Sequence, residues 1–315
     1  MLMRTTVPVI CFAAILLLSV ISFGADISSN AGTSAFPFLK IDVGARAVSM
    51  GSAFTGLADD EMALYYNPAG IARFDEKRFI AEYHSYFAGL NSGVVGVILP
   101  SRKYVLGFHI NYLSYGTFTQ TDLAGNITGD FGGSDMLFAG TGAFNINDEF
   151  SLGGTAKLIY EKISSYSASG VAFDLGAKYH SARDRYNAGI MLQNIGVQLS
   201  SLGSGDKAKL PLSLRLGGSV RPYEIPAILS ADVIVPIDNK PVIALGTDVY
   251  QFKPLYIRMG WNSFGSNYRA QGSNDNWAGF SIGAGFEYHK YEISYAFSPA
   301  ADLGESHRIT LTGGF

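Results

Sequence analysis

Apolar and polar residues alternate along most of the chain beyond about residue 77. From Tyr104 to Tyr112, every second residue is a tyrosine, leucine, phenylalanine or isoleucine, and the residues between are mostly small or polar. Successive side chains of a strand point to opposite faces, so this pattern predicts a strand with one apolar and one polar face. The segments 150–160, 171–179 and 212–220 alternate in the same way.

About fourteen such segments can be recognised, each near the roughly ten residues that a tilted strand needs to cross a bilayer. The predicted fold class is therefore all-β, a transmembrane antiparallel β-barrel of about 14 strands, with twelve or sixteen strands as alternatives. The segments are 77–86, 91–100, 103–115, 132–146, 150–162, 169–181, 185–195, 210–221, 226–236, 241–251, 254–262, 276–288, 290–299 and 305–315.

Charged residues in the middle of these segments share the face opposite the apolar one. A lipid-facing Lys or Arg at the bilayer midplane costs about 2–4 kcal/mol, whereas a lumen tolerates charge. The residues predicted to face the lumen are Glu82, His109, Lys157, Asp174, Lys178, Arg215, Asp232, Asp248, Arg258 and Glu292.

The connections between the segments alternate in length. Short connections are expected at 101–102, 147–149, 182–184, 222–225, 252–253 and 289, and they alternate with longer ones that include 116–131, 196–209 and 263–275. Even-numbered barrels have short turns in the periplasm, where both termini lie, and longer loops outside. A soluble sandwich gives no reason for this alternation.

Composition agrees with a barrel but does not prove one. Charged residues make up 16% of the 315 residues, below the roughly 25% of soluble domains. The net charge of -3 gives no basic surface for nucleic acid. The 37 glycines and 13% aromatic residues suit a β-rich protein, although a soluble β-sandwich has a similar composition.

Residues 1–24 have the pattern of a secretory signal peptide. Arg4 precedes an apolar run over 7–21, and small residues follow, so cleavage is expected after Gly24. The alternative is an N-terminal membrane anchor, but the run is shorter than the roughly 20 residues of a spanning helix. The only cysteine, Cys11, lies here, so the mature chain is expected to lack thiols and disulfides.

The last residues alternate to a terminal aromatic, Phe315. This ending resembles the signal that the outer-membrane assembly machinery reads. Together with the signal peptide and the strands, it predicts the outer membrane of a Gram-negative-type bacterium. Membrane lipid and the assembly machinery are the partners expected from this location.

Residues 25–76 do not follow the strand pattern. They carry a G-A-R-A run at 44–47, M-G-S-A-F at 50–54, D-D-E at 59–61 and N-P-A-G at 67–70. This series resembles the amino-terminal region of FadL-like outer-membrane proteins, most closely the branch named after PorV and PorQ. Members of that family have fourteen strands.

The resemblance implies that residues 25–76 fold as a hatch, or plug, inside a barrel formed by residues 77–315. Arg46 in a lumen needs an acidic partner. Asp59, Asp60 and Glu61 are nearest in sequence, and the strands offer Asp174, Asp232 and Asp248, while Lys157, Arg215 and Arg258 are available to the acidic trio. The candidate hatch residues are Gly44, Arg46, Met50, Gly51, Asp59, Asp60, Asn67, Pro68, Ala69 and Gly70. We expect them to hold the plug rather than contact a ligand directly, with 67–69 close to the inner wall.

No motif indicates catalysis, a cofactor or a metal. The chain has no G-x-S-x-G, P-loop or H-E-x-x-H pattern, and its five histidines show no ligand spacing. His109 is expected to face inward and His307 outward, neither with an evident serine partner. Asp59-Asp60 and Asn274-Asp275 are interpreted as solvated turns rather than cation sites.

Two functions follow from the resemblance. FadL-type members take up hydrophobic small molecules passively, such as long-chain fatty acids or hydrocarbons, and outer-loop residues would collect the ligand: Phe118, Leu123, Ile127, Phe131 and Leu202. In the PorV-like branch the barrel instead binds secreted protein cargo of a secretion system. The sequence does not choose between these two. A general porin is disfavoured because porins rarely keep an amino-terminal segment of this length.

Overall fold

The computed structural model describes residues 28–203, 205–268 and 277–315. The expected signal peptide with Cys11 and the Asn274-Asp275 pair lie outside these residues. Within the described ranges, no helix has both the length and the apolar composition needed to cross a membrane.

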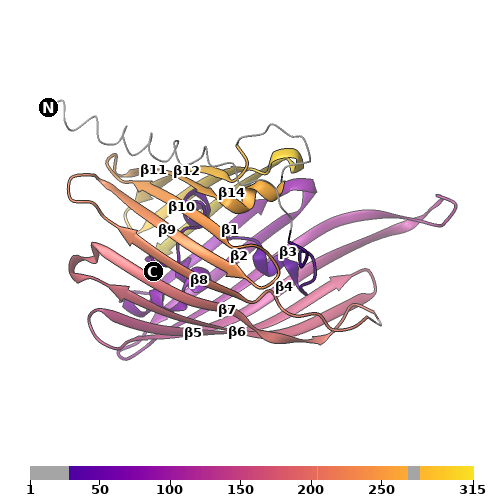
Figure 1. Ribbon diagram of the computed structural model, residues 1–315, viewed down its shortest axis with the longest axis horizontal. Coiled ribbons are helices and arrows are strands. Elements are labelled where there is room, and N and C mark those ends of the chain that lie inside the picture. Colours follow the sequence, from indigo (N-terminus) through magenta and orange to yellow (C-terminus); the bar gives the residue numbers. More distant parts are fainter. Residues whose placement is uncertain (1–27, 204, 269–276) are drawn as a thin grey trace.

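Fourteen antiparallel strands close into one barrel, as the sequence predicts (Figure 1). Each strand pairs with its neighbours in sequence, and β1 also pairs with β14, so no strand edge remains open. The strands are β1 (Arg78–Ser85), β2 (Asn91–Pro100), β3 (Val105–Thr121), β4 (Ile127–Asn145), β5 (Phe150–Ile163), β6 (Tyr166–His180), β7 (Tyr186–Ser200), β8 (Ser213–Val220), β9 (Ala227–Pro236), β10 (Val242–Val249), β11 (Leu255–Asn262), β12 (Phe280–Tyr288), β13 (Tyr291–Pro299) and β14 (Glu305–Gly314).

The two ends of the barrel differ. We call the end with the short connections β2–β3, β4–β5, β6–β7, β8–β9, β10–β11 and β12–β13 the turn end; it also holds Phe315, whose amide donates to Lys77 O. The opposite end is the loop end. By the rule for even-numbered barrels, the turn end faces the periplasm. Short 3-10 helices lie in the connections: η3 (Phe87–Gly89), η4 (Ala182–Asp184), η5 (Ser263–Tyr268) and η6 (Ala301–Leu303).

The prediction of a loop over 116–131 was wrong. β3 and β4 continue as a paired hairpin that extends well beyond the other strands (Figure 1). Phe118 and Phe131 stack across it with ring centroids 5.4 Å apart, and cross-strand aromatic pairs stabilise such ribbons. At the tip, Asp122 accepts hydrogen bonds from the amides of Ala124 and Asn126, which fixes the turn. β7 likewise continues to Ser200, into the loop predicted at 196–209.

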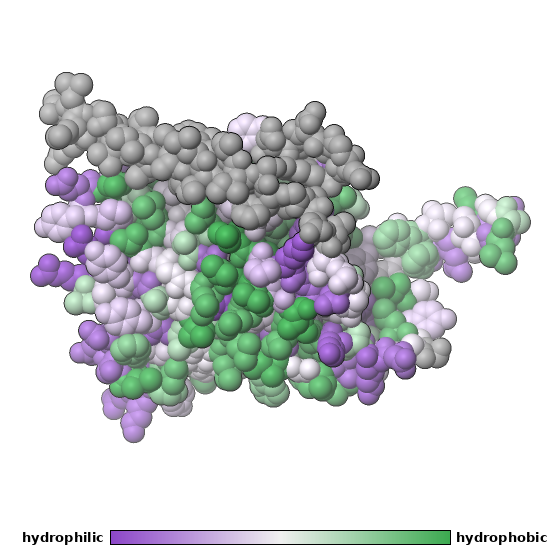
Figure 2. Space-filling model, viewed as in Figure 1, coloured by the Kyte–Doolittle hydropathy of each residue, from purple (hydrophilic) through white to green (hydrophobic). Residues whose placement is uncertain are grey.

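Large apolar side chains cover the outer wall. Leu158, Phe173 and Ile282, for example, are each more than half exposed. Figure 2 shows hydrophobic residues across the middle of the visible wall and hydrophilic residues toward its ends. A closed barrel with such an exterior is built to face lipid, and the chain is an outer-membrane β-barrel.

The segment before β1 folds into four short helices that contact the strands from inside. They are η1 (Pro37–Lys40), α2 (Ala45–Ser49), α3 (Ala63–Tyr66) and η2 (Pro68–Arg73). α2 contacts β11 to β14, and η2 contacts β3 to β6. We call residues 34–76 the N-terminal segment.

The N-terminal segment reaches both ends of the barrel. Ser34 bridges to Lys209 at the loop end, while Arg73 pairs with Asp184 at the turn end, so the segment runs the length of the lumen. Apolar packing accounts for this course. Phe36 and Phe38 join an inward-facing cluster near the loop end that includes Leu113, Leu137, Ile159 and Leu210.

Charge on the outer wall is expected to depend on depth. Leu158→Arg, near the middle of β5 and 61% exposed, should lower the free energy of unfolding by about 2–4 kcal/mol. The matched change Leu123→Arg, at the hairpin tip beyond the barrel, should alter it by less than about 0.5 kcal/mol. Urea unfolding in lipid vesicles measures both, and equal losses would contradict a lipid-facing wall at Leu158.

Candidate functional site

The glycine and alanine residues of 44–53 let the N-terminal segment lie directly against the wall. Gly51 has a φ of +64°, and a Cβ added there would lie 2.7 Å from backbone atoms of Leu245 and Trp261. Gly44, with a φ of +85°, precedes α2 and faces Met62. Any larger residue at Gly51 would push α2 away from β10 and β11.

The side chain of Asn67 joins the start of η2 to Thr55 of the N-terminal segment and to β6 of the wall. Its side chain accepts from Ala69 N at 3.2 Å and donates to Thr55 O at 3.0 Å and to Ala177 O of β6 at 3.1 Å. Pro68 then begins η2. The backbone of Pro68 and Ala69 lies against β5, where a Cβ added to Gly153 would be 2.4 Å from Pro68 C. The N-P-A-G run thus sits on the inner wall.

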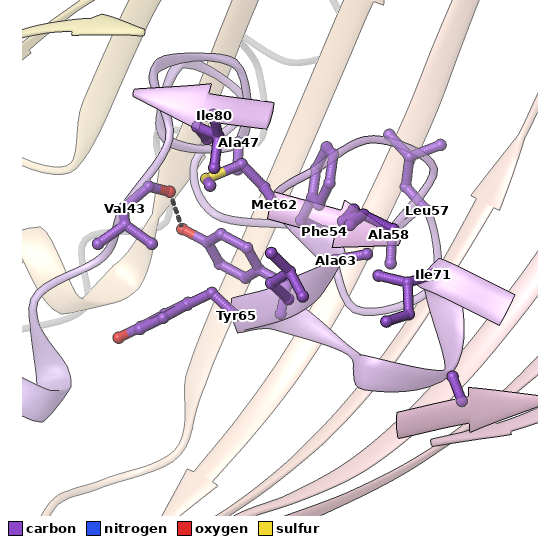
Figure 3. Close-up of a cluster of buried hydrophobic side chains, with 14 of the residues drawn as sticks. Val43, Ala47, Phe54, Leu57, Ala58, Met62, Ala63, Tyr65, Ile71 and Ile80 are labelled. Carbon is purple, nitrogen blue, oxygen red and sulfur yellow. Dashed lines mark hydrogen bonds between the residues drawn. The ribbon is translucent and has the colours of Figure 1, made fainter. Parts of the chain in front are cut away.

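An apolar core joins the N-terminal segment to β1, β2 and β3 (Figure 3). Tyr66 packs edge-on against Phe54 at 5.5 Å, and its hydroxyl donates to Val43 O at 3.0 Å. The buried members from the segment include Met50, Leu57, Met62, Leu64 and Ile71, and the wall contributes Ile80, Val94, Ile98 and Val105. This part of the lumen is filled by side chains.

Arg46 forms ion pairs both within the N-terminal segment and with the barrel wall. Its Nη1 lies 2.7 Å from Asp59 Oδ1 and 2.9 Å from Asp60 Oδ2, and its Nε lies 3.0 Å from Asp248 Oδ2 of β10. Asp248 also pairs with Arg258 of β11 at 3.1 Å. Arg258 in turn lies 2.8 Å from Glu292 of β13. Alternating charges therefore run from α2 across the turn-end half of the lumen.

Other inward charges bind backbone groups of the N-terminal segment. Asp232 of β9 accepts from Phe54 N at 3.1 Å and Thr55 N at 2.8 Å. Glu82 of β1 accepts from Gly44 N at 2.6 Å. These bonds satisfy amides that a folded segment inside a barrel would otherwise leave buried and unpaired.

Two basic side chains act in the same way. Lys178 of β6 donates to the carbonyls of Leu57 and Ala58. Arg215 of β8 donates to Ser52 O at 3.0 Å and lies over the Tyr66 ring at 5.0 Å.

The expected pairing of strand charges was wrong in part. Lys157 pairs with Asp174 within the wall at 2.6 Å, and Arg215 and Arg258 do not contact the acidic trio. The trio instead meets two arginines that were not predicted: Arg221 lies 2.9 Å from Asp59, and Arg78 lies 2.6 Å from Glu61. In the closed barrel these cations have other carboxylate partners: Lys157 has Asp174 of the neighbouring strand, and Arg258 has Asp248 and Glu292. His109 is buried, with neither ring nitrogen hydrogen-bonded.

A cavity of about 180 Å³ lies near the loop end, between the N-terminal segment and the wall. Its apolar lining includes Leu39, Ile41, Val48, Val242 and Phe280. We call it the loop-end cavity. The apolar loop residues expected to collect a ligand, Phe118, Leu123, Ile127, Phe131 and Leu202, are not part of this lining.

Two further cavities are polar and lie toward the turn end. One, of about 290 Å³, is lined by Arg46, Asp60, Glu61 and Arg78 among others. The other, of about 260 Å³, is lined by Asp59, Lys178, His180 and Arg221 among others. The two ends of the lumen therefore differ in chemistry: the cavity near the loop end is largely apolar, and those toward the turn end are polar.

Sequence reasoning missed Arg308, which also lines the loop-end cavity. Arg308 lies on the face of β14 opposite Ile309 and Leu311, so the alternation used for the other strands would have placed it inside. It also missed a histidine–serine contact nearby. His84 Nε2 lies 2.9 Å from Ser306 Oγ, and His84 Nδ1 lies 3.0 Å from Ser92 Oγ.

Fold and interior together define the class: a fourteen-stranded outer-membrane barrel with a folded segment in its lumen. Neither a family model nor a curated protein matches the chain. Among solved structures it is similar to the toluene transporter TbuX of Ralstonia pickettii, with a TM-score of 0.61 and 13% identity over 87% of this chain and 98% of that one.

Two further structures agree. The toluene transporter TodX of P. putida has a TM-score of 0.59 and 12% identity, over 87% of this chain and 98% of that one. The monoaromatic hydrocarbon channel CymD has a TM-score of 0.57 and 11% identity, over 87% and 97%. At these identities the likeness shows a shared fold, that of FadL-type channels. All three are described as channels or transporters, so they lend no support to the PorV-like alternative.

Arg46→Ala should loosen the N-terminal segment while the barrel stays folded. The change removes the cation shared by three buried or partly buried carboxylates, at a cost of about 3–5 kcal/mol. Faster hydrogen exchange over 44–73 and higher planar-bilayer conductance are expected. The control Arg73→Ala breaks a pair that is 43% and 47% exposed and worth less than about 1 kcal/mol. Equal exchange in both variants would contradict this role of Arg46.

Glu61 should make the attachment of the N-terminal segment depend on pH. Burial raises the pKa of Glu61 from 4.5 to about 7; the charge of Asp60 adds to the rise, and Arg78 opposes it. A raised acid pKa gives stability that is fully present below pH 4.5 and is lost as pH rises through 7. The loss is at most about 3 kcal/mol.

Hydrogen exchange over 59–78, corrected for its intrinsic pH dependence, measures this effect. Protection in the wild-type chain should fall between pH 4.5 and 7. Glu61→Gln carries no charge at either pH, so its protection should stay level. A variant that follows the wild-type profile would show that another group titrates.

Proposed function

We propose that the chain passively transports small hydrophobic molecules across the outer membrane, with residues 25–76 as the hatch that closes the lumen. The loop-end cavity is the observation that carries this proposal. It lies between hatch and wall, at the end assigned to the cell exterior, and largely apolar side chains such as Leu39, Val48 and Phe280 contribute to it.

The size of the cavity indicates a small ligand. Its volume of about 180 Å³ is below the roughly 300–1,000 Å³ of drug-sized sites. It is close to the roughly 150 Å³ of an engineered apolar cavity that binds benzene. The similar structures are described as toluene transporters and a monoaromatic hydrocarbon channel, which agrees with a ligand of one ring.

The hatch blocks the direct way from this cavity to the turn end. The apolar core around Phe54 and Tyr66 and the charges around Arg46 fill the path. A ligand therefore passes only when the hatch, or the wall beside it, rearranges. In this proposal the motif residues hold the closed state: Gly51 by close packing, Asn67 by its three hydrogen bonds and Arg46 by its ion pairs.

The loop end offers a contact that can be locked to test hatch movement. Asp238, in the β9–β10 loop, accepts from Ser34 Oγ and lies 2.7 Å from Lys40 Nζ. Since Cys11 lies in the expected signal peptide, a Ser34→Cys/Asp238→Cys pair would have no competing thiol in the mature chain. Oxidation would then bond the hatch at residue 34 to the wall at residue 238.

Uptake of labelled toluene is measured in proteoliposomes whose outer leaflet is lipopolysaccharide, which slows passage through lipid. The wild-type chain should raise uptake several-fold over protein-free liposomes. The oxidised cysteine pair should lower it toward the protein-free rate, and dithiothreitol should restore it, while Ser34→Cys alone is insensitive to oxidation. Equal uptake with and without the protein would rule out transport. Unchanged uptake in the locked pair would rule out hatch movement at this point.

A further inference from the structure

Arg308 is a buried cation at the wall of the loop-end cavity. It lies on β14 with 4% of its surface exposed. Its Nη1 donates to Ser306 Oγ at 3.0 Å, and its Nη2 donates to Asp42 O at 3.3 Å. Its Nε is buried and has no hydrogen-bond partner. The Nε donor is therefore free, and Nη2 makes only a long bond to a neutral carbonyl.

Arg308 also differs from the other lumen arginines in its charge partners. Arg46, Arg215 and Arg258 each lie within 4.0 Å of a carboxylate. Across the part of the chain that the structure describes, no carboxylate comes that close to Arg308.

The carboxylates of Glu82 and Asp42, which belong to residues that interact with Arg308, accept from other donors. Glu82, whose charge acts on Arg308, accepts from Gly44 N and Thr310 Oγ1. Asp42 directs its carboxylate to Ser52 Oγ at 2.7 Å and to Arg215 at 4.0 Å. His84, the titratable group beside Ser306, bonds to two serine hydroxyls. None of these groups neutralises the guanidinium directly.

A buried guanidinium with no carboxylate bonded to it is costly, and an ionisable residue inside a membrane protein is a candidate ligand site. The geometry here suits one ligand group. The Nε and Nη2 atoms form one edge of the guanidinium fork, and this edge matches the two oxygens of a carboxylate. That edge holds the free Nε and the weakly bonded Nη2.

We propose that the loop-end cavity binds a small amphipathic monocarboxylate, such as an aromatic or short-chain acid. Its carboxylate binds the Nε–Nη2 edge of Arg308, and its apolar part packs against Leu39, Ile41 and Phe280. This assignment rests on the proposed transport function and specifies its substrate class. A neutral hydrocarbon would offer no acceptor to the Nε–Nη2 edge of Arg308, so we expect an aromatic acid to bind more tightly than the hydrocarbon that has the same ring.

Binding would also act on the hatch. Asp42 belongs to the N-terminal segment, and its carbonyl holds Arg308 Nη2 only at 3.3 Å. A ligand carboxylate is a stronger acceptor than a carbonyl. It therefore replaces the contact between the hatch and β14 at this point.

The test uses the full mature chain in nanodiscs, with benzoate and toluene as probes of the same ring. Equilibrium dialysis should show benzoate bound at least tenfold more tightly than toluene by the wild-type chain. Arg308→Gln should weaken benzoate binding about 10- to 100-fold and leave toluene binding nearly unchanged. Arg308→Lys keeps the charge without the fork and should recover part of the loss. Arg102→Gln, an equal charge change at an exposed turn-end residue, should have no effect.

Each outcome decides a different point. Retained toluene binding shows that Arg308→Gln is folded, and wild-type benzoate affinity in that variant would overturn the assignment. A wild-type chain that binds and transports toluene but not benzoate would also overturn it, with the transport function intact. If the wild-type chain transports neither compound, the proposed function itself fails.

Discussion

Charges inside the barrel are removed from bulk water, and the rest of the interior is arranged around this constraint. Asp232, Lys178 and Glu82 project from the wall and bind amides and carbonyls of the N-terminal segment. The segment has too little regular structure to satisfy its own backbone, since its helices are only four to six residues long. Wall and segment therefore complete each other's hydrogen bonds, which favours one placement of the segment over others.

Close packing reinforces this placement. At the wall glycines Gly153, Gly246 and Gly260, an added Cβ would lie only 2.0 to 2.4 Å from backbone atoms of the segment. The segment has small residues of its own, Gly51 and Ala69, at these contacts. A polar wall alone would hold a segment loosely through water. Matched small residues and direct hydrogen bonds instead leave no gap for water where Gly51 and Ala69 lie against the wall.

The loop end is organised differently, and the proposed function depends on that difference. There the segment contributes Leu39, Ile41 and Val48 to a cavity instead of filling the space. Arg308 is left with incomplete bonding at its edge. Toward the turn end, Arg46, Arg78 and Arg221 have carboxylate partners from the segment. The segment thus fills the turn-end half of the lumen with paired charges, and in the loop-end half it leaves a largely apolar cavity beside the incompletely bonded edge of Arg308.

The strands, their number and their two faces could be predicted from the sequence, because alternation is a local property of each strand. Residues as far apart as Glu82 and Glu292 were assigned to the polar face from their own neighbours alone. Candidate partners could be named from the sequence, but the choice among them could not be predicted. Of the three strand carboxylates expected for Arg46, only Asp248 pairs with it. Asp232 binds backbone amides of the segment instead, and Asp174 pairs with Lys157 across β5 and β6. Nor could the sequence predict that the N-terminal segment reaches the loop end, or that one edge of Arg308 stays free. Each depends on which atoms remain unpaired once all strands have closed, and only the tertiary structure decides that.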